Sequence, residues 1–142
     1  MKLPQPLARF ITPQHQALLL EFIRFGLVGT SGVVVDLAAA YGTVWLVGPY
    51  GAGAISYLCA ATWTWALNRI WTWRGRGSGP LWREWLRWLG VNTSGLVFNR
   101  GLFFILITLS PYCYDHLYIP IALGGIAGMF ANFFLARRLV FR

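Results

Sequence analysis

The chain has 142 residues, of which 57% are hydrophobic and only 11% are charged, and its net charge is +8. Soluble domains carry about a quarter of charged residues, so one small water-soluble core cannot hide this much apolar surface. The composition excludes an ordinary soluble domain and indicates an integral membrane protein.

The first predicted helix begins at Thr12 and Pro13, because threonine is a good N-cap and proline is tolerated in the first helical turn. This N-terminal part is expected to form an interfacial helix. Four charge-poor stretches follow, each about as long as the roughly 20 residues that cross a hydrocarbon core. Because peptide groups in lipid cannot bond to water, each stretch must be helical. The sequence thus predicts an all-α protein with four transmembrane helices, at Phe25–Val47, Ala52–Trp73, Trp88–Leu109 and Leu117–Val140.

The stretch between the second and third spans has two parts. RGRGSGP (Arg74–Pro80) is typical of a flexible link. LWREWLRW (Leu81–Trp88) places Arg83, Glu84 and Arg87 on one helical face and its Leu and Trp residues on the other. This pattern predicts a second interfacial helix, with tryptophans at headgroup depth.

The basic residues predict the orientation. The loops at Gly48–Gly51 and Ser110–His116 contain neither Lys nor Arg. By the positive-inside rule, both termini and the central link are therefore expected on the cytoplasmic side of the cytoplasmic membrane. The net charge is explained by this topology, and no nucleic-acid partner is expected. The basic residues outside the span centres are Lys2, Arg9, Arg24, Arg69, Arg74, Arg76, Arg83, Arg87, Arg137, Arg138 and Arg142.

The chain contains an internal repeat. FIRFGLVGTSGVVVD (Phe22–Asp36) aligns without gaps on WLRWLGVNTSGLVFN (Trp85–Asn99), and NRIWTWR (Asn68–Arg74) aligns on ARRLVFR (Ala136–Arg142). We predict a single domain, 1–142, of two tandem helical hairpins with the same orientation, related by a pseudo-two-fold axis. The first repeat spans 22–74, the second 85–142, and the linker 75–84. Close helix packing is predicted at small and polar residues spaced by three or four positions, namely Gly26, Gly29, Gly32, Gly124, Gly128 and Asn132.

Polar residues inside the spans form a predicted intramembrane site. Asp36 lies about 18 Å beyond Arg24, and Arg100 about 20 Å beyond Arg87, which places both near the bilayer midplane. A charge at that depth must face protein, water or a partner. Two interpretations stay open: a substrate-facing site, or a static ion pair that fixes how the repeats pack. The predicted site consists of Asp36, Asn99, Arg100, Thr30 and Thr93.

A second predicted site lies at the cytoplasmic helix ends, where each repeat opens and closes with an arginine. Guanidinium groups bind two phosphate oxygens at once, so this cluster suits a phosphate. Plain positive-inside anchoring is the alternative. The residues concerned are Arg69, Arg137, Arg24, Arg87, Asn68 and Asn132.

The sequence lacks a nucleotide-binding loop, a metal-ligand cluster and a nucleophile–base pair. We therefore expect no metal, no cofactor and no enzymatic activity.

Three of these features resemble the GtrA-like family of small four-span membrane proteins: FIRFGLVG (Phe22–Gly29), the carboxylate Asp36, and NRIWTW (Asn68–Trp73). NFFLARRLVF (Asn132–Phe141) is a partial second copy of the last motif. The resemblance implies translocation of a polyprenyl-phosphate-linked monosaccharide for cell-surface polysaccharide synthesis or O-antigen modification. It also implies membrane glycosyltransferases as partners, beside the membrane lipids. Four short helices hardly enclose such a substrate alone, so a homo-oligomer, most simply a dimer, is expected.

Two other functions remain open. The first is export of small cations in the manner of four-helix multidrug exporters, with Asp36 as the proton-coupled residue and Trp63, Trp65 and Tyr41 as an aromatic cage. Arg100 at the same depth argues against it. The second is a membrane anchor that recruits a glycosyltransferase without transporting anything.

Overall fold

The computed structural model describes residues 12–77 and 79–142, and all regular secondary structure in them is helical. The chain forms two compact units, Met1–Gly77 and Ser78–Arg142. Lys2, Arg9 and most of the segment before Pro13 lie outside the described residues.

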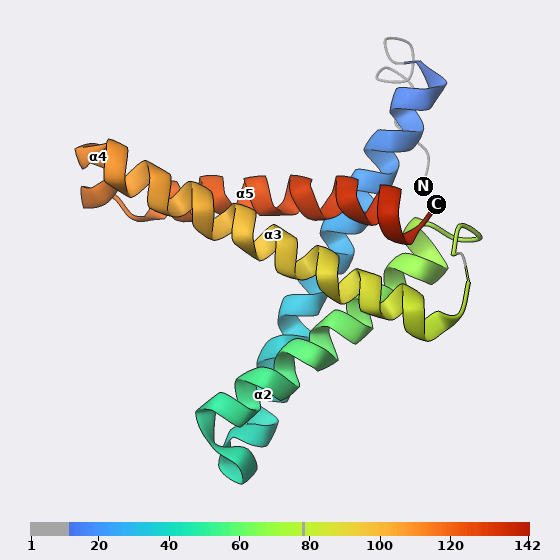
Figure 1. The fold of residues 1–142 in the computed structure, drawn as a ribbon, viewed down its shortest axis with the longest axis horizontal. Coiled ribbons are helices and arrows are strands. Elements are labelled where there is room, and N and C mark those ends of the chain that lie inside the picture. The colour runs from blue at the N-terminus through green and yellow to red at the C-terminus, as the bar shows by residue number, and fades with distance from the viewer. Residues whose placement is uncertain (1–11, 78) are drawn as a thin grey trace. The chain divides into compact units, whose positions relative to one another are not determined.

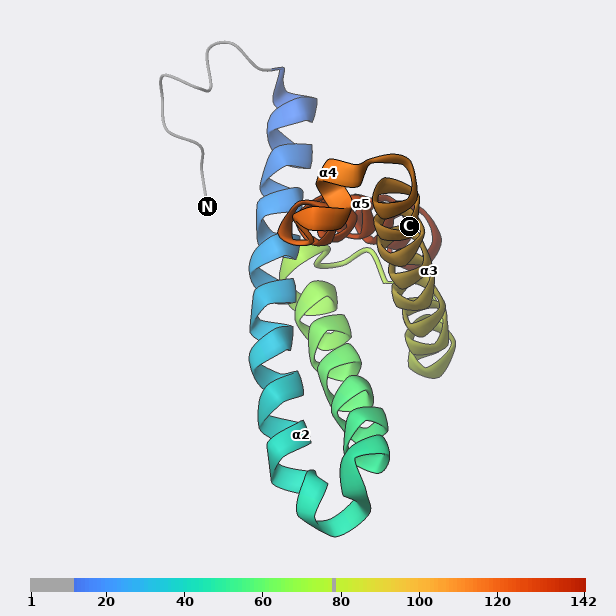
Figure 2. The same cartoon turned by 90° about the vertical axis from the view of Figure 1, so that its left-hand side faces the viewer.

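The first unit is a helical hairpin. Helix α2 (Pro13–Leu67) contains one non-helical residue, Gly48, with φ 70° and ψ 174°. Glycine adopts this positive φ readily, and Pro49 after it has no N–H to continue the helical ladder. The chain reverses there, so that the two arms of α2, residues 13–47 and 49–67, lie side by side (Figure 2). The second arm continues into η1, a π-helix (Asn68–Thr72).

The second unit is also a hairpin. Helix α3 (Leu81–Leu109) is followed by the short α4 (Pro111–Asp115), by α5 (Tyr118–Leu135) and by a second π-helix, η2 (Ala136–Val140). Helices α3 and α5 pack along each other (Figure 1).

Three helices in the described residues are long and apolar enough to cross a membrane: Pro13–Thr72, Leu81–Leu109 and Tyr118–Val140. The first has 60 residues, which would extend about 90 Å if straight, against a hydrocarbon core of about 30 Å. The reversal at Gly48 divides it into two arms, each closer to the length of one crossing. Large apolar side chains stay exposed on all these helices, as lipid-facing surfaces require.

The predicted interfacial helices do not form as separate elements. Helix α2 begins at Pro13, as expected from Thr12 and Pro13, and runs without a break into the first apolar stretch. Likewise Leu81–Trp88 forms the first turns of α3. No proline follows Leu81 in this helix and nothing else interrupts its hydrogen bonds, which explains the continuity. Of the three residues predicted on one face of this segment, Arg83 and Arg87 are exposed, whereas Glu84 is fully buried.

Equivalent positions in the two hairpins have the same local structure. The π-helices η1 and η2 begin at Asn68 and Ala136, which the repeat aligns with each other. An aromatic pair joins the helices beside each π-helix. Phe25 and Trp73 have ring centroids 5.6 Å apart, and the aligned pair, Trp88 and Phe141, 5.9 Å. Aligned residues of the two hairpins thus make similar local contacts.

The small residues confirm part of the packing prediction. Gly32 lies against Thr64, and Gly95 lies against Asn132. Gly124 and Gly128 pack on α3, where a Cβ atom would approach the backbone oxygens of Asn99 and Gly95 to 2.6 and 2.8 Å. Gly26 and Gly29 make no such contact within the first hairpin, because no atom of the described residues lies within 4 Å of a Cβ placed on either one. Positions three residues apart differ by about 60° in direction around an α-helix, so Gly26, Gly29 and Gly32 do not all face the same neighbour.

Candidate anion-binding site

A tight turn follows η1 in the first unit. The N–H of Trp73 donates to the carbonyl of Asn68 at 2.8 Å, which closes the π-helical turn, and the N–H of Arg76 donates to the carbonyl of Trp73 at 3.0 Å. Gly75, third in the four-residue turn Trp73–Arg76, has φ 82°. A type II turn requires a positive φ at this position, and glycine adopts it without steric cost. We call residues 73–77 the arginine loop.

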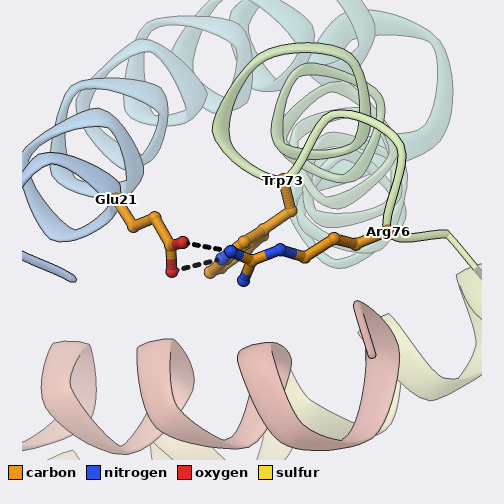
Figure 3. Close-up of polar contacts among 3 residues, drawn as sticks. All are labelled: Glu21, Trp73 and Arg76. Atoms are coloured by element: carbon orange, nitrogen blue, oxygen red, sulfur yellow. Dashed lines mark hydrogen bonds and ion pairs between the residues drawn. The ribbon is translucent and has the colours of Figure 1, made fainter. Parts of the chain in front are cut away.

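Glu21, from the first arm of α2, holds the arginine loop with both carboxylate oxygens. The indole Nε1 of Trp73 donates to Oε2 at 3.2 Å, and Nη2 of Arg76 donates to Oε1 at 2.6 Å (Figure 3). The Glu21 side chain is 9% exposed and that of Arg76 42%. A buried carboxylate with two donors, one of them charged, is a well-satisfied group. It ties the end of the second arm to the first.

An open pocket of about 410 Å³ lies on the arginine loop and η1. It is lined by Arg69, Ile70, Arg74, Gly75 and Gly77. The turn gives the two arginines of the loop different surroundings: Arg74 lines the pocket, whereas Arg76 is bound by Glu21. Two guanidinium groups beside glycine backbone form a site suited to an oxyanion such as phosphate.

Of the predicted phosphate residues, Arg69 is the one that lines this pocket. Arg24, on the first arm, lies with its guanidinium carbon 6.0 Å from the ring centre of Trp71. Its buried Nε has no hydrogen-bond partner within the described residues. Asn68 is 1% exposed, with an unpartnered Oδ1, so it faces the interior and not the pocket.

The remaining predicted phosphate residues belong to the second unit. Arg137 lies in η2, and Arg87 is an exposed residue of α3. Asn132 packs on Gly95, and its buried Oδ1 has no hydrogen-bond partner within the described residues. Its surroundings are those of a helix contact.

The predicted intramembrane residues are divided between the units. Asp36 lies half-buried in the first arm of α2, and Arg100 is exposed on α3. Asn99 packs against Gly124 and Gly128 of α5. The proximity of Asp36 and Arg100 therefore stays a prediction.

Thr30 and Thr93 have equivalent roles in the two hairpins. Their hydroxyls donate to the carbonyls of Gly26 and Leu89, each at 3.0 Å and four residues earlier. Such bonds satisfy a hydroxyl within its own helix. Each hydroxyl oxygen keeps a lone pair that can still accept a hydrogen bond.

Sequence reasoning did not identify Glu21, although a signal was present. The chain has four acidic residues, and two of them, Glu21 and Glu84, occupy equivalent positions when the repeat alignment is extended by one residue. Both are buried. A carboxylate kept at the same place in each repeat, beside an apolar stretch, indicates a paired and structured group.

The described residues contain no group of three or more His, Cys, Asp or Glu side chains that could hold a metal ion. Cys59 and Cys113 are free cysteines.

These long apolar helices, with a cationic pocket at the end of one of them, define a helical membrane protein. The family model of the GtrA/DPMS transmembrane domain matches residues 24–141, and the chain belongs to this family. Membership confirms the resemblance noted from the motifs and connects the protein with glycosylation-related processes that use lipid-linked sugars. Proteins of this family are generally non-catalytic. Comparison with curated proteins and with solved structures gave no match.

Proposed function

We propose that the protein translocates a polyprenyl-phosphate-linked monosaccharide across the cytoplasmic membrane. The observation that carries this proposal is the pocket lined by Arg69 and Arg74. Two guanidiniums can together contact several oxygens of one phosphodiester, which is the charged group of such a carrier. The pocket is open, so a lipid headgroup could enter it without unfolding the hairpin.

The proposed topology places this pocket on the cytoplasmic side. The two arms of α2 would each cross the membrane once, as would α3 and α5, giving four spans with both termini in the cytoplasm. Arg69, Arg74, Arg76 and Arg83 surround the central link, in keeping with the positive-inside rule. A lipid-linked sugar made in the cytoplasm would thus meet the pocket first.

Translocation would then use the intramembrane polar residues. In a pseudo-two-fold arrangement of the repeats, Asp36 and the Asn99–Arg100 pair would lie across a common axis. They could exchange hydrogen bonds with the sugar while the polyprenyl chain stays in lipid. Arg137 would give the second repeat its own phosphate contact. A homodimer would enlarge the path, and membrane glycosyltransferases would supply and consume the substrate.

The decisive experiment is transport in proteoliposomes that contain the purified protein and a radiolabelled polyprenyl-phosphoryl sugar. Outward exposure of the sugar should exceed that in empty vesicles, and the Arg69→Ala/Arg74→Ala variant should reduce the excess. Equal exposure with and without the protein would overturn the proposal. If the protein instead binds a glycosyltransferase and increases its activity, the anchor function would replace it.

Cation export makes a different prediction. Proton release upon addition of a lipophilic cation, abolished by Asp36→Asn, would favour that function. The cationic lining of the pocket does not favour a cationic substrate.

A further inference from the structure

We propose that Glu21 is a positioning residue of the anion pocket. Its carboxylate would hold Arg76 and Trp73, and in this way keep Arg74 and Gly75 at the pocket wall. The inference rests on the proposed function, because it takes the Arg69–Arg74 pocket as the phosphate site. The inference assigns a role to Arg76 and Trp73, the residues of the loop that contact Glu21 and do not line the pocket.

The loop is short, so the residues that contact Glu21 are close in the chain to the residues that line the pocket. Arg76 is two residues from Arg74 and one from Gly77, and both neighbours line the pocket. The hydrogen bond from the Arg76 N–H to the Trp73 carbonyl at 3.0 Å closes the turn between them. The Glu21 carboxylate accepts a hydrogen bond from the first and the last residue of this turn, from Nε1 of Trp73 and from Nη2 of Arg76. Movement of either end would move Arg74.

The ion pair between Glu21 and Arg76 also determines which arginines remain for the phosphate. Glu21 occupies the guanidinium of Arg76, so the phosphate would be bound by Arg69 and Arg74. Arginine in a preorganised site loses less entropy for each bond it forms. The carboxylate would therefore increase anion affinity although its own charge repels anions.

This opposition gives a sharp test. If Glu21 acted only through its field, removal of its charge would strengthen anion binding, and removal of the Arg76 charge would weaken it. If Glu21 positions the loop, Glu21→Gln and Arg76→Gln should both weaken binding, although they change the net charge in opposite directions. The two replacements together should then cost little more than either one, because they break the same contact.

The experiment measures binding of farnesyl phosphate to the full-length protein in detergent by calorimetry. Farnesol serves as the uncharged control, and inorganic phosphate distinguishes a free anion from a lipid phosphate. We expect Glu21→Gln and Arg76→Gln each to raise the Kd by about fivefold to tenfold, part of the contribution of a charge-assisted hydrogen bond. Glu21→Asp, which keeps the carboxylate, should restore part of the loss.

Matched controls come from the second unit of the chain. Glu84→Gln removes the equivalent buried carboxylate, and Arg83→Gln removes an exposed arginine, so each reproduces one of the two charge changes at a residue that does not line the pocket. Both controls should leave the Kd within about twofold. Because the Arg76 side chain is 42% exposed, its variant should fold even if Glu21→Gln does not.

The outcomes separate the two proposals. Tighter binding by Glu21→Gln, or an unchanged Kd for Arg76→Gln, would overturn the positioning role and leave the proposed function intact. An unchanged Kd for the Arg69→Ala/Arg74→Ala variant would remove the phosphate site itself, and the proposed function would lose the observation that carries it.

Discussion

Gly32 lies so close to Thr64 that a Cβ atom on the glycine would stand 2.5 Å from Cγ2 of the threonine. The hydroxyl of Thr64 is bonded to the carbonyls of Ala60 and Ala61 at 2.8 and 3.1 Å. These bonds fix the side-chain rotamer, so the methyl group cannot turn away without breaking them. The two arms of α2 thus approach as closely as glycine allows, which is a common way for membrane helices to pack.

Gly32→Ala should therefore destabilise the first hairpin by about 1–3 kcal/mol, the usual effect of overpacking. Thermal melting of the detergent-purified protein measures the change. Gly29→Ala is the matched control, because no atom lies within 4 Å of its Cβ position, and it should have almost no effect. Thr64→Ser removes the methyl group and keeps the hydroxyl, so Gly32→Ala/Thr64→Ser should recover most of the loss. Failure of this rescue would contradict the contact.

Replacement of the pocket arginines should weaken phosphate binding. Arg69→Ala and Arg74→Ala should each raise the Kd for farnesyl phosphate by about tenfold or more, since each removes a charge-assisted contact. Lysine should restore only part of the affinity, because its ammonium cannot bind two oxygens in a planar fork. Arg138→Ala is the control, an exposed arginine of η2 outside the pocket lining. A similar loss in this variant would show that the effect is one of overall charge.

Gly75→Ala should distort the arginine loop. The residue has φ 82°, which costs an L-amino acid about 1 kcal/mol or more. We expect a lower melting temperature and weaker binding of farnesyl phosphate together. Gly90→Ala provides the comparison, because Gly90 lies within α3 with no atom within 4 Å of its Cβ position. There alanine should be neutral or stabilising, owing to its higher helix propensity.

The intramembrane charges should matter for transport. In proteoliposomes with equal amounts of protein, Arg100→Ala should lower the rate of sugar exposure by about tenfold, equivalent to about 1.4 kcal/mol of barrier. The reason is that the sequence predicts Arg100 near the midplane, where a guanidinium needs a polar partner. Arg100→Lys keeps the charge and should preserve more of the rate. Unchanged transport by Arg100→Ala would assign this residue to packing.

The sequence predicted the parts of the fold that depend on hydropathy and repetition. The helical class, the two hairpins and the start of α2 at Pro13 follow from charge-poor stretches, alignment and capping chemistry. The π-helices at Asn68 and Ala136 could not be predicted in this way. Apolar periodicity reports which residues are buried, whereas the choice between i→i+4 and i→i+5 bonds depends on tertiary packing.

The site was predicted only in part, for a similar reason. Of the two arginines that line the pocket, Arg69 was among the predicted phosphate residues, whereas Arg74 was treated as a topology signal, because a link rich in glycine and arginine is typical of a flexible segment. In the structure this loop is bonded to Glu21, 55 residues before Arg76 in the chain. Long-range contacts of this kind leave no local pattern, and the equivalence of Glu21 and Glu84 was the one available indication.

The π-helical turns have a geometric consequence for how each hairpin closes. Every residue in a regular α-helix advances about 100° around the axis, so one residue more or fewer changes the direction of every side chain beyond it. A π-helical turn holds about one residue more than an α-helical turn, so winding the same residues of η1 as a regular α-helix would turn Trp73 away from Phe25 and Glu21. In each hairpin, the π-helical turn sets the direction of the aromatic residue that follows it, so that Trp73 faces Phe25 and Phe141 faces Trp88.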